Sequence, residues 1–416
     1  MIKAQGYVFQ KLSIENCVNI FYGQYVRFVQ FESLFIVAAR FKFYYILTVP
    51  LKKAYFVLII GDIFNVAHGF LLRMKFTYFI IISMILAVSW SGCQSVDKDD
   101  ADQFFLKGNV QLTRKNYEEA IRYYQEAILK NPDFADAYLN QGLAYLQLDQ
   151  LNEAFQAFSA AIGLDSKLLP AYLARAETAT RLSRWNEAEA DLHVLSKAYA
   201  DSSQYYLIKG NMLAGKNNPS AALAEYDRSL LLDPKNTEAY VNRGAMFFAQ
   251  RDYKSASEDF KKALHFNPNQ LEALNNLGLL ASRAMLWDTA LSYFDRALRV
   301  NAVDPLSLNN KGYVLLQTGN LELAAELINR SLRNMPDNGY ALRNLGVYYL
   351  KKQDLKNATA TFEKALALDQ LVEFLHGYAG EAYLKSGNKD QACELWNTGT
   401  VLHDSMAIAD YKQYCQ

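Results

Sequence analysis

A series of asparagines spaced 34 residues apart is the strongest candidate for binding chemistry in this 416-residue chain. Asn242, Asn276, Asn310 and Asn344 form its unbroken part, and Asn140 lies earlier in the same register. A carboxamide both donates and accepts hydrogen bonds, so such a series could hold the backbone of an extended peptide without reading its side chains. The sequence shows no catalytic pattern: the five histidines are scattered, and there is no nucleophile elbow or phosphate loop.

The asparagines belong to a pattern that occurs nine times from Ala101 to Met406. Alanine recurs without substitution at nine positions from Ala120 to Ala392, and glycine recurs at eight of nine positions, with Ala176 as the exception. A period of 34 residues is typical of a helix-turn-helix solenoid. Numbered from its first residue, each repeat is predicted to hold helices at roughly positions 2–14 and 18–31. The predicted repeats are 101–134, 135–168, 169–202, 203–236, 237–270, 271–304, 305–338, 339–372 and 373–406.

The residue types within a repeat predict how its two helices pack and where they end. Glycine at position 8 and alanine at position 20 would let the helix backbones approach closely, with large residues at positions 4 and 24 around them. Proline at position 32 ends the second helix in several repeats, because it removes an amide donor. Asn or Asp in the turn could cap the second helix. The capping candidates are Asn116, Asp149, Asn218, Asp252, Asn320, Asp354 and Asn388.

Positions 4, 8, 11, 20, 24, 27 and 32 of these units resemble the tetratricopeptide repeat, over about three quarters of the chain. The resemblance implies an all-α fold: a right-handed superhelical solenoid of nine 34-residue helix-turn-helix repeats, with first helices lining the concave side. One repeat cannot bury both faces of its helices, so stability comes from stacking neighbours. Residues 407–416 place Ile408, Tyr411 and Tyr414 at helical spacing, which predicts a helix capping the last repeat.

The resemblance also implies where a ligand would lie. Tetratricopeptide-repeat proteins bind ligands in the concave groove, against positions 2, 5, 6, 9, 12 and 13. The C-terminal half is therefore predicted to be polar, aromatic and locally positive, suited to a polar or acidic tail, and the N-terminal half more apolar. The alternative is that asparagine at position 6 is a common structural choice in these repeats. The predicted groove residues are Asn140, Asn242, Asn276, Asn310, Asn344, Arg283, Tyr313, Tyr340, Arg343, Lys351 and Lys385, and the apolar ones are Phe105, Leu139, Leu143, Leu146, Leu173 and Leu207.

The segment before the repeats resembles a bacterial lipoprotein signal. The predicted signal segment covers residues 74–92: Arg73 and Lys75 supply basic residues at its start, Phe76–Val88 an apolar stretch, and Ser91 and Gly92 small residues immediately before Cys93. The resemblance implies a lipid on Cys93, a charged tether over 93–100, and an outer-membrane lipoprotein facing the periplasm or cell surface. Residues 1–73 would then precede a start at Met74 and be absent from the mature protein. The alternatives are an uncleaved membrane anchor, or ordinary secretion with an incidental cysteine.

Charge and cysteine content narrow the classes of partner. Residues 1–93 hold nine Lys and Arg against three acids, which leaves 34 basic and 40 acidic residues in 94–416 and argues against nucleic-acid binding. We predict no metal, cofactor or small-molecule substrate.

Four cysteines are too few for a disulfide scaffold. Cys393 and Cys415 either pair in an oxidising compartment or, as the favoured interpretation, stay separate buried thiols.

These patterns together predict a non-enzymatic scaffold. It would be tethered to a membrane and bind a partner protein or extended peptide in its groove, in cell-envelope assembly or secretion. Two alternatives remain: a structural solenoid that associates with itself, and a protein that binds glycans or the cell wall through its many tyrosines. Repeat 3 departs most from the pattern, which could make it a flexible joint before residue 203.

Overall fold

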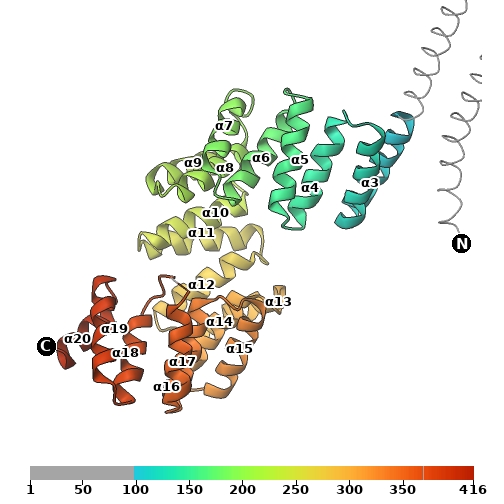
Figure 1. Cartoon of the computed structure of the whole chain (residues 1–416). Helices are drawn as coiled ribbons and strands as arrows, with labels where there is room; N and C mark the ends of the chain where they lie inside the picture. Colours follow the sequence, from blue (N-terminus) through green and yellow to red (C-terminus); the bar gives the residue numbers. More distant parts are fainter. Residues whose placement is uncertain (1–97, 369) are drawn as a thin grey trace, which may run out of the picture. The chain divides into compact units, whose positions relative to one another are not determined.

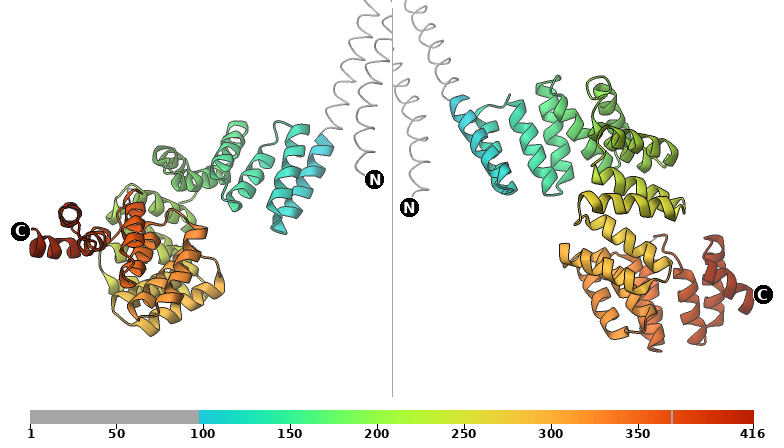
Figure 2. Two further views of the ribbon diagram at one scale, coloured as in Figure 1. Left: turned by 60° about the horizontal axis from the view of Figure 1, so that its bottom comes forward. Right: turned by 180° about the vertical axis from the view of Figure 1, so that it is seen from behind.

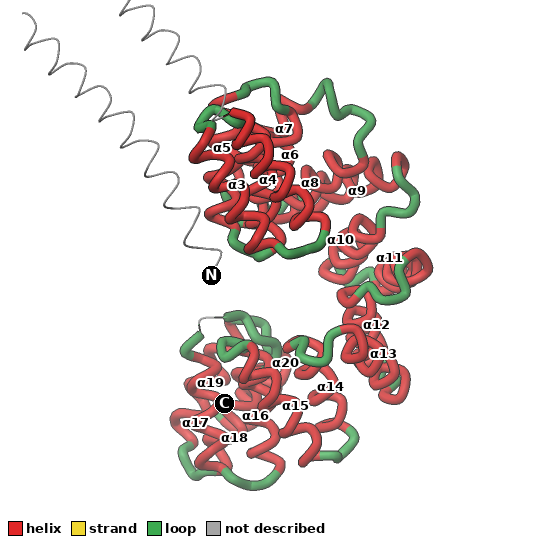
Figure 3. Tube along the Cα trace, turned by 90° about the vertical axis from the view of Figure 1, so that its right-hand side faces the viewer, coloured by secondary structure: helices red, strands yellow, loops and turns green. Residues whose placement is uncertain are grey.

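The structure is a computed structural model that describes residues 98–368 and 370–416. Within these ranges every regular element is a helix, as the tube in Figure 3 shows. Val96–Gln416 form one compact unit, in which each helix packs against its neighbours in chain order (Figure 1). The predicted all-α repeat solenoid is therefore confirmed. The predicted signal segment, Cys93 and residues 94–97 of the tether lie outside the described residues.

The first helices of the repeats run from position 1 to position 13 in most repeats, one residue earlier than predicted. In repeat 1 the helix covers residues 98–113, so the last three residues of the predicted tether are helical. In repeat 9 the first helix begins at position 3, two residues later than in most repeats, after an irregular segment. The first helices are residues 98–113, α4 (Ala135–Gln147), α6 (Leu169–Arg181), α8 (Ser203–Gly215), α10 (Thr237–Ala249), α12 (Leu271–Arg283), α14 (Pro305–Gln317), α16 (Gly339–Lys351) and α18 (Leu375–Lys385).

The second helices run from position 17 to position 30 in most repeats. They alternate with the first helices along the stack in both views of Figure 2. The second helices are α3 (Tyr117–Lys130), α5 (Leu151–Leu164), α7 (Trp185–Leu195), α9 (Pro219–Leu232), α11 (Tyr253–Phe266), α13 (Trp287–Val300), α15 (Leu321–Asn334), α17 (Leu355–Leu366) and α19 (Lys389–Val401).

The recurring small residues allow the close packing that their positions predict. All nine alanines at position 20 are fully buried. A Cβ atom added at Gly142 would lie 2.5 Å from the Phe158 ring, and one added at Gly278 would lie 2.4 Å from the Phe294 ring. Repeat 3 has alanine in place of this glycine, and the smaller Leu192 lies at position 24 instead of an aromatic ring. The aromatic side chain at position 24 therefore demands glycine at position 8.

The turn between the two helices holds a residue with positive φ at position 15 of every repeat, from Lys115 at 62° to Gly387 at 87°. Two capping predictions fail because Asn116 and Asn320 make no capping hydrogen bond from their side chains. Asp149 is not a cap either, because it occupies the left-handed position one residue earlier, with φ of 60°. The remaining candidates accept a hydrogen bond from a first-turn amide, as predicted: Asn218, Asp252, Asp354 and Asn388.

The stack is continuous through repeat 3. Leu192 and Leu195 of α7 share one core cluster with Tyr205, Ile208 and Met212 of α8. The helix α7 is shorter than its counterparts and is followed by a longer turn. The proposed joint at repeat 3 stays a prediction, because these contacts describe one arrangement of the two repeats.

The last repeat is covered by α20 (Ser405–Tyr414), as predicted, and of the three expected residues Tyr411 and Tyr414 pack there, the Tyr414 ring stacking on Trp396 with centroids 5.6 Å apart. Ala407, Tyr411 and Cys415 face the cluster around Trp396, whereas Ile408 is 42% exposed. Cys415 forms a disulfide with Cys393 of α19, with Cα atoms 5.8 Å apart. The favoured interpretation of two separate thiols is therefore wrong: closure of α20 onto α19 brings the two cysteines together.

Candidate functional site

Asn140 and Asn242, two members of the asparagine series, make the same contact in different repeats. Asn140 Nδ2 donates to Asn109 Oδ1 of the preceding repeat at 2.8 Å, and Asn109 Oδ1 also accepts from the Tyr124 hydroxyl at 2.8 Å. Asn242 repeats this geometry with Asn211 at 2.8 Å, and the Tyr226 hydroxyl donates to Asn211 at 2.9 Å. We call this arrangement of two asparagines and one tyrosine the inter-repeat bridge.

The inter-repeat bridge provides the hydrogen-bond acceptor that a buried tyrosine hydroxyl needs. Burial raises the pKa of Tyr124 to about 12, with a smaller opposing effect from its hydrogen bonding, and burial also raises the pKa of Tyr226. Each hydroxyl stays neutral and needs an acceptor, which the asparagine carbonyl supplies. Asn140 and Asn242 therefore already hold neighbouring repeats together, and their amide nitrogens each have a partner within the chain.

Asn344 and Arg343 form a buried polar cluster on α16. Their exposed fractions are only 1% and 7%. Asn344 donates to Asn309 Oδ1 at 2.8 Å and accepts from Arg343 Nε at 3.1 Å and Nη2 at 2.7 Å. The Arg343 guanidinium also lies over the rings of Tyr313 and Tyr340. The prediction that these two residues face an open groove is wrong, because the following segment of chain covers them.

That covering segment is residues 370–374, the irregular part of the connection between α17 and α18. Arg343 Nη1 donates to the Glu373 carbonyl at 2.7 Å, and the Tyr340 hydroxyl donates to the Leu371 carbonyl at 3.4 Å. Gln370 Oε1 accepts from the Gly339 amide at 3.2 Å. Phe374 has a φ of 61°, which turns the chain into α18. The first-helix surface of repeat 8 thus already binds the backbone of an extended segment of its own chain.

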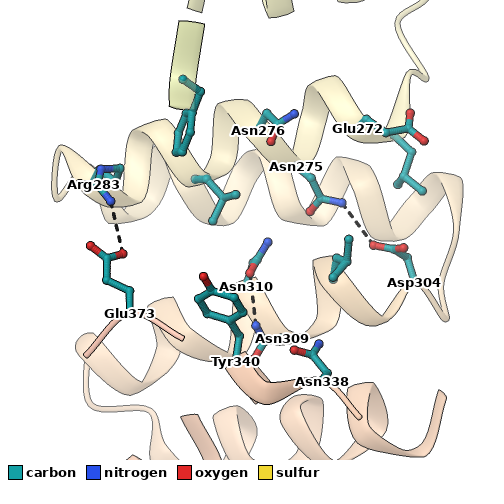
Figure 4. Close-up of a pocket in the computed structure, with 14 residues that line it drawn as sticks. Glu272, Asn275, Asn276, Arg283, Asp304, Asn309, Asn310, Asn338, Tyr340 and Glu373 are labelled. Carbon is teal, nitrogen blue, oxygen red and sulfur yellow. Dashed lines mark hydrogen bonds and ion pairs between the residues drawn. The ribbon is translucent and has the colours of Figure 1, made fainter. Parts of the chain in front are cut away.

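A pocket of about 500 Å³ lies beside this segment, on the surface made by α10, α12, α14 and α16. Figure 4 shows Arg283 of α12 meeting Glu373 at one end, and Asp304 and Asn338 near the other end. Every lining residue comes from a first helix, its N-terminal flank or residues 370–374, which agrees with the implied location of the groove. The lining residues are Phe248, Leu271, Glu272, Asn275, Asn276, Leu279, Arg283, Asp304, Leu306, Asn309, Asn310, Asn338, Tyr340 and Glu373.

Three amide side chains in the pocket have hydrogen-bonding capacity to spare. The Asn276 side chain has no hydrogen-bond partner among the described residues, and Asn310 only accepts from Asn309 Nδ2 at 3.3 Å. The Asn338 Nδ2 atom is buried and lacks an acceptor within the described ranges. In contrast, the Asn275 side chain is engaged at both ends, donating to Asp304 Oδ2 and accepting from the Ser307 hydroxyl. Asn276, Asn310 and Asn338 are therefore the amides of this surface that a ligand could engage.

The charge of this surface differs from the prediction. Arg283 pairs with Glu373 at 3.6 Å, and Lys385 pairs with Glu381 on its own helix at 2.8 Å. Lys351 is exposed at the end of α16. Since Arg343 is also buried, the predicted locally positive surface is wrong. The pocket is lined by one cation and three carboxylates, those of Glu272, Asp304 and Glu373.

A row of glutamates extends from the pocket toward the N-terminal repeats. Burial raises the pKa of Glu238, and the charge of Glu272 raises it further. Burial likewise raises the pKa of Glu177, with the charge of Glu238 adding to the effect. Arg181 lowers both pKa values, but it also forms an ion pair with Asp149. The charges of these carboxylates therefore act on one another, and the pKa values of Glu177 and Glu238 lie above their ordinary range.

The predicted apolar groove of the N-terminal half is largely part of the core. Leu207 is 1% exposed and Leu139 is 9% exposed, so neither offers a free apolar surface. Phe105, Leu143, Leu146 and Leu173 are partly buried and pack against the core clusters of their repeats. The prediction is wrong for Leu139 and Leu207, because stacking of the next repeat covers them.

Two searches of the described residues give no further site. No group of His, Cys, Asp and Glu side chains within them could hold a metal ion. None of the helices they form is long and apolar enough to cross a membrane. The pocket with its three available amides thus remains the candidate site.

The paired helices and their period define a helical-hairpin repeat solenoid, and comparison with known families identifies the repeat. Models described as tetratricopeptide repeat match residues 105–168, 173–237, 237–270, 275–338 and 341–370, together more than half of the chain. The chain therefore belongs to the tetratricopeptide-repeat family. It is accordingly a scaffold for protein–protein interaction.

Relatives and solved structures resemble the chain through its repeats. Homo sapiens serine/threonine-protein phosphatase 5 is 33% identical over 97 residues, which cover 23% of this chain and 19% of the relative. The Arabidopsis thaliana TPR repeat-containing thioredoxin TDX is 27% identical over 113 residues, which cover 27% and 30%. The chain spans less than a third of either relative. The structure of the APC/C hetero-tetramer Cut9–Hcn1 shares the fold, with a TM-score of 0.56 and 15% identity over 76% of each chain.

Several residues of the site were missed from sequence alone. Asn275 and Asn309 lie at position 5, where earlier repeats have an apolar residue, and this switch was an available signal. Glu272 and Asn338 gave no such signal, since isolated polar residues near helix N-termini are common. Residues 370–374 became recognisable as part of the site only from their contacts with Arg343 and Tyr340.

Proposed function

We propose that the chain is a non-enzymatic scaffold that binds an extended segment of a partner protein on the first-helix surface of repeats 5–8. The observation that carries this proposal is the pocket, whose apolar walls are combined with the amides of Asn276, Asn310 and Asn338. Such a combination suits a peptide backbone, which presents both donors and acceptors along its length. The carbonyls of residues 371 and 373, held by Tyr340 and Arg343, support it as an intramolecular example.

The buried acids support a non-enzymatic role because they have structural partners. Arg243 donates to both carboxylate oxygens of Asp259, at 2.8 and 2.7 Å, and Arg175 does the same with Asp191. These carboxylates are 5% and 2% exposed. A carboxylate whose two oxygens are both occupied by an arginine offers neither oxygen to a substrate and is poorly suited to acid–base catalysis.

The proposal places the protein in the cell envelope, anchored by a lipid on Cys93, where it serves assembly or secretion. The Cys393–Cys415 disulfide supports this placement, because disulfides persist in oxidising compartments and are rare in the cytosol. We expect Cys93→Ser to move the protein from the membrane fraction to the soluble fraction. Mass spectrometry of the mature N-terminus checks the modification directly, and an unmodified Cys93 in a membrane-bound protein would contradict it.

Crosslinking tests the binding surface. A photoreactive amino acid at Asn276 should trap a partner protein in cells, whereas the same group at Asp288, exposed on α13 and away from the pocket, should not. If Asn276 traps only a second copy of the chain, and light scattering shows dimers that form with concentration, the solenoid self-associates instead. Retention on purified peptidoglycan without any trapped protein would favour a cell-wall ligand.

A further inference from the structure

We infer that the pocket receives an aliphatic side chain of an extended partner segment, with a lysine or arginine beside it in that segment. This inference rests on the proposed function, because it names the chemistry of the segment that the same surface binds. Three features of the pocket carry it: an apolar wall, a buried amide donor without an acceptor, and a row of glutamates.

The apolar wall comes from three successive first helices. Phe248 lies on α10, Leu271 and Leu279 lie on α12, and Leu306 lies on α14. Leu306 is 49% exposed, so its side chain offers apolar surface at the pocket wall. A cavity of about 500 Å³ is within the range of ligand pockets and has room for a large side chain with its flanking backbone. An aliphatic side chain would remove this apolar surface from water.

The buried donor belongs to Asn338, the N-cap residue of α16. Its Oδ1 atom accepts from the Ala341 amide at 3.1 Å, so the orientation of the carboxamide is set by the capping bond. This leaves Nδ2 at the pocket wall without an acceptor among the described residues, although the side chain is only 6% exposed. A buried unpaired donor is unfavourable unless a ligand supplies an acceptor. The carbonyl groups of an extended peptide are suitable acceptors.

The glutamate row determines the sign of the partner's charge. Glu272 lines the pocket and is exposed, and its charge acts on Glu238, which acts in turn on Glu177. The nearby cations are already engaged: Arg181 pairs with Asp149, and Arg283 pairs with Glu373. A lysine or arginine next to the aliphatic residue would pair with Glu272 and relieve the repulsion along the row. An acidic neighbour would add to that repulsion.

A peptide array tests this chemistry with the purified full-length chain. Decapeptides of systematically varied composition should bind best when Leu, Ile or Val stands next to Lys or Arg. For the best of them, Glu272→Gln combined with Glu238→Gln should weaken binding about tenfold, because the first change removes the ion-pair partner of the basic residue and the second removes the negative charge behind it. The matched control is Glu258→Gln, which removes an exposed carboxylate from α11 outside the pocket and should leave affinity unchanged.

A second variant tests the amide donor. Asn338→Asp keeps an oxygen for the capping bond to Ala341 and removes the donor, so the fold should be retained. With an uncharged peptide that contains leucine, we expect affinity to fall about tenfold.

The possible outcomes separate the two proposals. Peptides without a basic residue that bind as tightly as the best basic ones, or affinity unchanged in the double glutamine variant, would overturn the inference and leave groove binding intact. If no array peptide binds but the photoreactive group at position 276 traps a partner, the crosslinked segment of that partner is sequenced. The inference requires an aliphatic residue next to a basic residue in that segment, and their absence would contradict it. If no peptide binds and nothing is trapped, the proposed function fails as well.

Discussion

Repeats 5 and 6 place an asparagine at the same position of the same helix, yet the two side chains have different surroundings. In repeat 5, Asn242 donates to Asn211 of the preceding repeat at 2.8 Å. In repeat 6, Asn276 has no hydrogen-bond partner among the described residues and lines the pocket. A series that looks uniform in the sequence is therefore divided into bridging members and members available to a ligand.

The difference originates in the preceding repeat. Repeat 4 has Asn211 at position 9 and Tyr226 at position 24, which complete the inter-repeat bridge. Repeat 5 has Ala245 and Phe260 at these positions, so Asn276 finds no acceptor and no hydroxyl. Asparagine at position 9 and tyrosine at position 24 occur together in repeats 1 and 4 and in no other repeat. Both the structural and the binding role considered for these asparagines are thus realised, each in its own repeats.

The largest expected effect is that of Asn344→Ala, which tests the buried member of the series. The change leaves Arg343 Nε and Nη2 without their acceptor and Asn309 without its donor. We expect the free energy of unfolding of α16 to fall by about 3 kcal/mol, because a buried charge loses its hydrogen bonds. Native-state hydrogen exchange of α16 measures this change. A loss below about 0.5 kcal/mol, the size of an ordinary surface substitution, would contradict it.

A smaller loss is expected for Asn242→Ala, which breaks one inter-repeat bridge. Removing this hydrogen bond should cost about 1 kcal/mol, the usual net value for such a bond. A double-mutant cycle with Tyr226→Phe measures the coupling, since both side chains bond to Asn211. Asn276→Ala is the matched control, and it should leave stability unchanged while weakening partner binding. Equal destabilisation by Asn242→Ala and Asn276→Ala would contradict the division of the series.

The difference between Asn242 and Asn276 can also be removed by building an inter-repeat bridge from repeat 5 to Asn276. Ala245→Asn with Phe260→Tyr supplies the missing acceptor and hydroxyl beneath Asn276. We expect a gain of up to about 1 kcal/mol in the free energy of unfolding from the new hydrogen bonds. Crosslinking from a neighbouring pocket residue should show weaker partner binding, because the Asn276 amide becomes engaged. Chemical denaturation gives the stability, and unchanged binding despite a formed bridge would argue against a role for Asn276.

The smallest effect is expected from the pH dependence of the glutamate row. The pKa values of Glu177 and Glu238 are raised in the folded state, so their protonation favours the folded chain. This contribution is fully present below the unfolded pKa of about 4.3 and is lost as pH rises through the folded pKa. As the pH rises from acidic to neutral, the wild type should therefore lose free energy of unfolding relative to Glu238→Gln. Urea unfolding at several pH values measures it, and a constant difference would refute the shift.

Much of the fold could be predicted because one packing solution is repeated. Ala120 and Gly142 illustrate why: a helix pair of fixed spacing requires small residues at fixed positions, and the sequence displays that requirement nine times. The errors occur where a single repeat departs from the others. Asp149 occupies the left-handed turn residue instead of the cap, and Ile408 faces solvent because Ala407 packs against Trp396. The period places Asp149 at position 15, one before the other capping candidates, so its register was an available signal, whereas Ile408 lies beyond the last repeat, where the period gives no guidance.

The helical-hairpin repeat, its register and the close contact of small and aromatic residues depend on local spacing alone, so they follow from the order of the amino acids. The packing of the repeats decided which amides are engaged, why Arg343 is buried, and which carboxylates surround the pocket. It also decided that Cys393 and Cys415 are bonded. The physical reason is that each of these properties depends on contacts between different repeats, with residues 370–374 or with α20, and such contacts follow from how these elements pack.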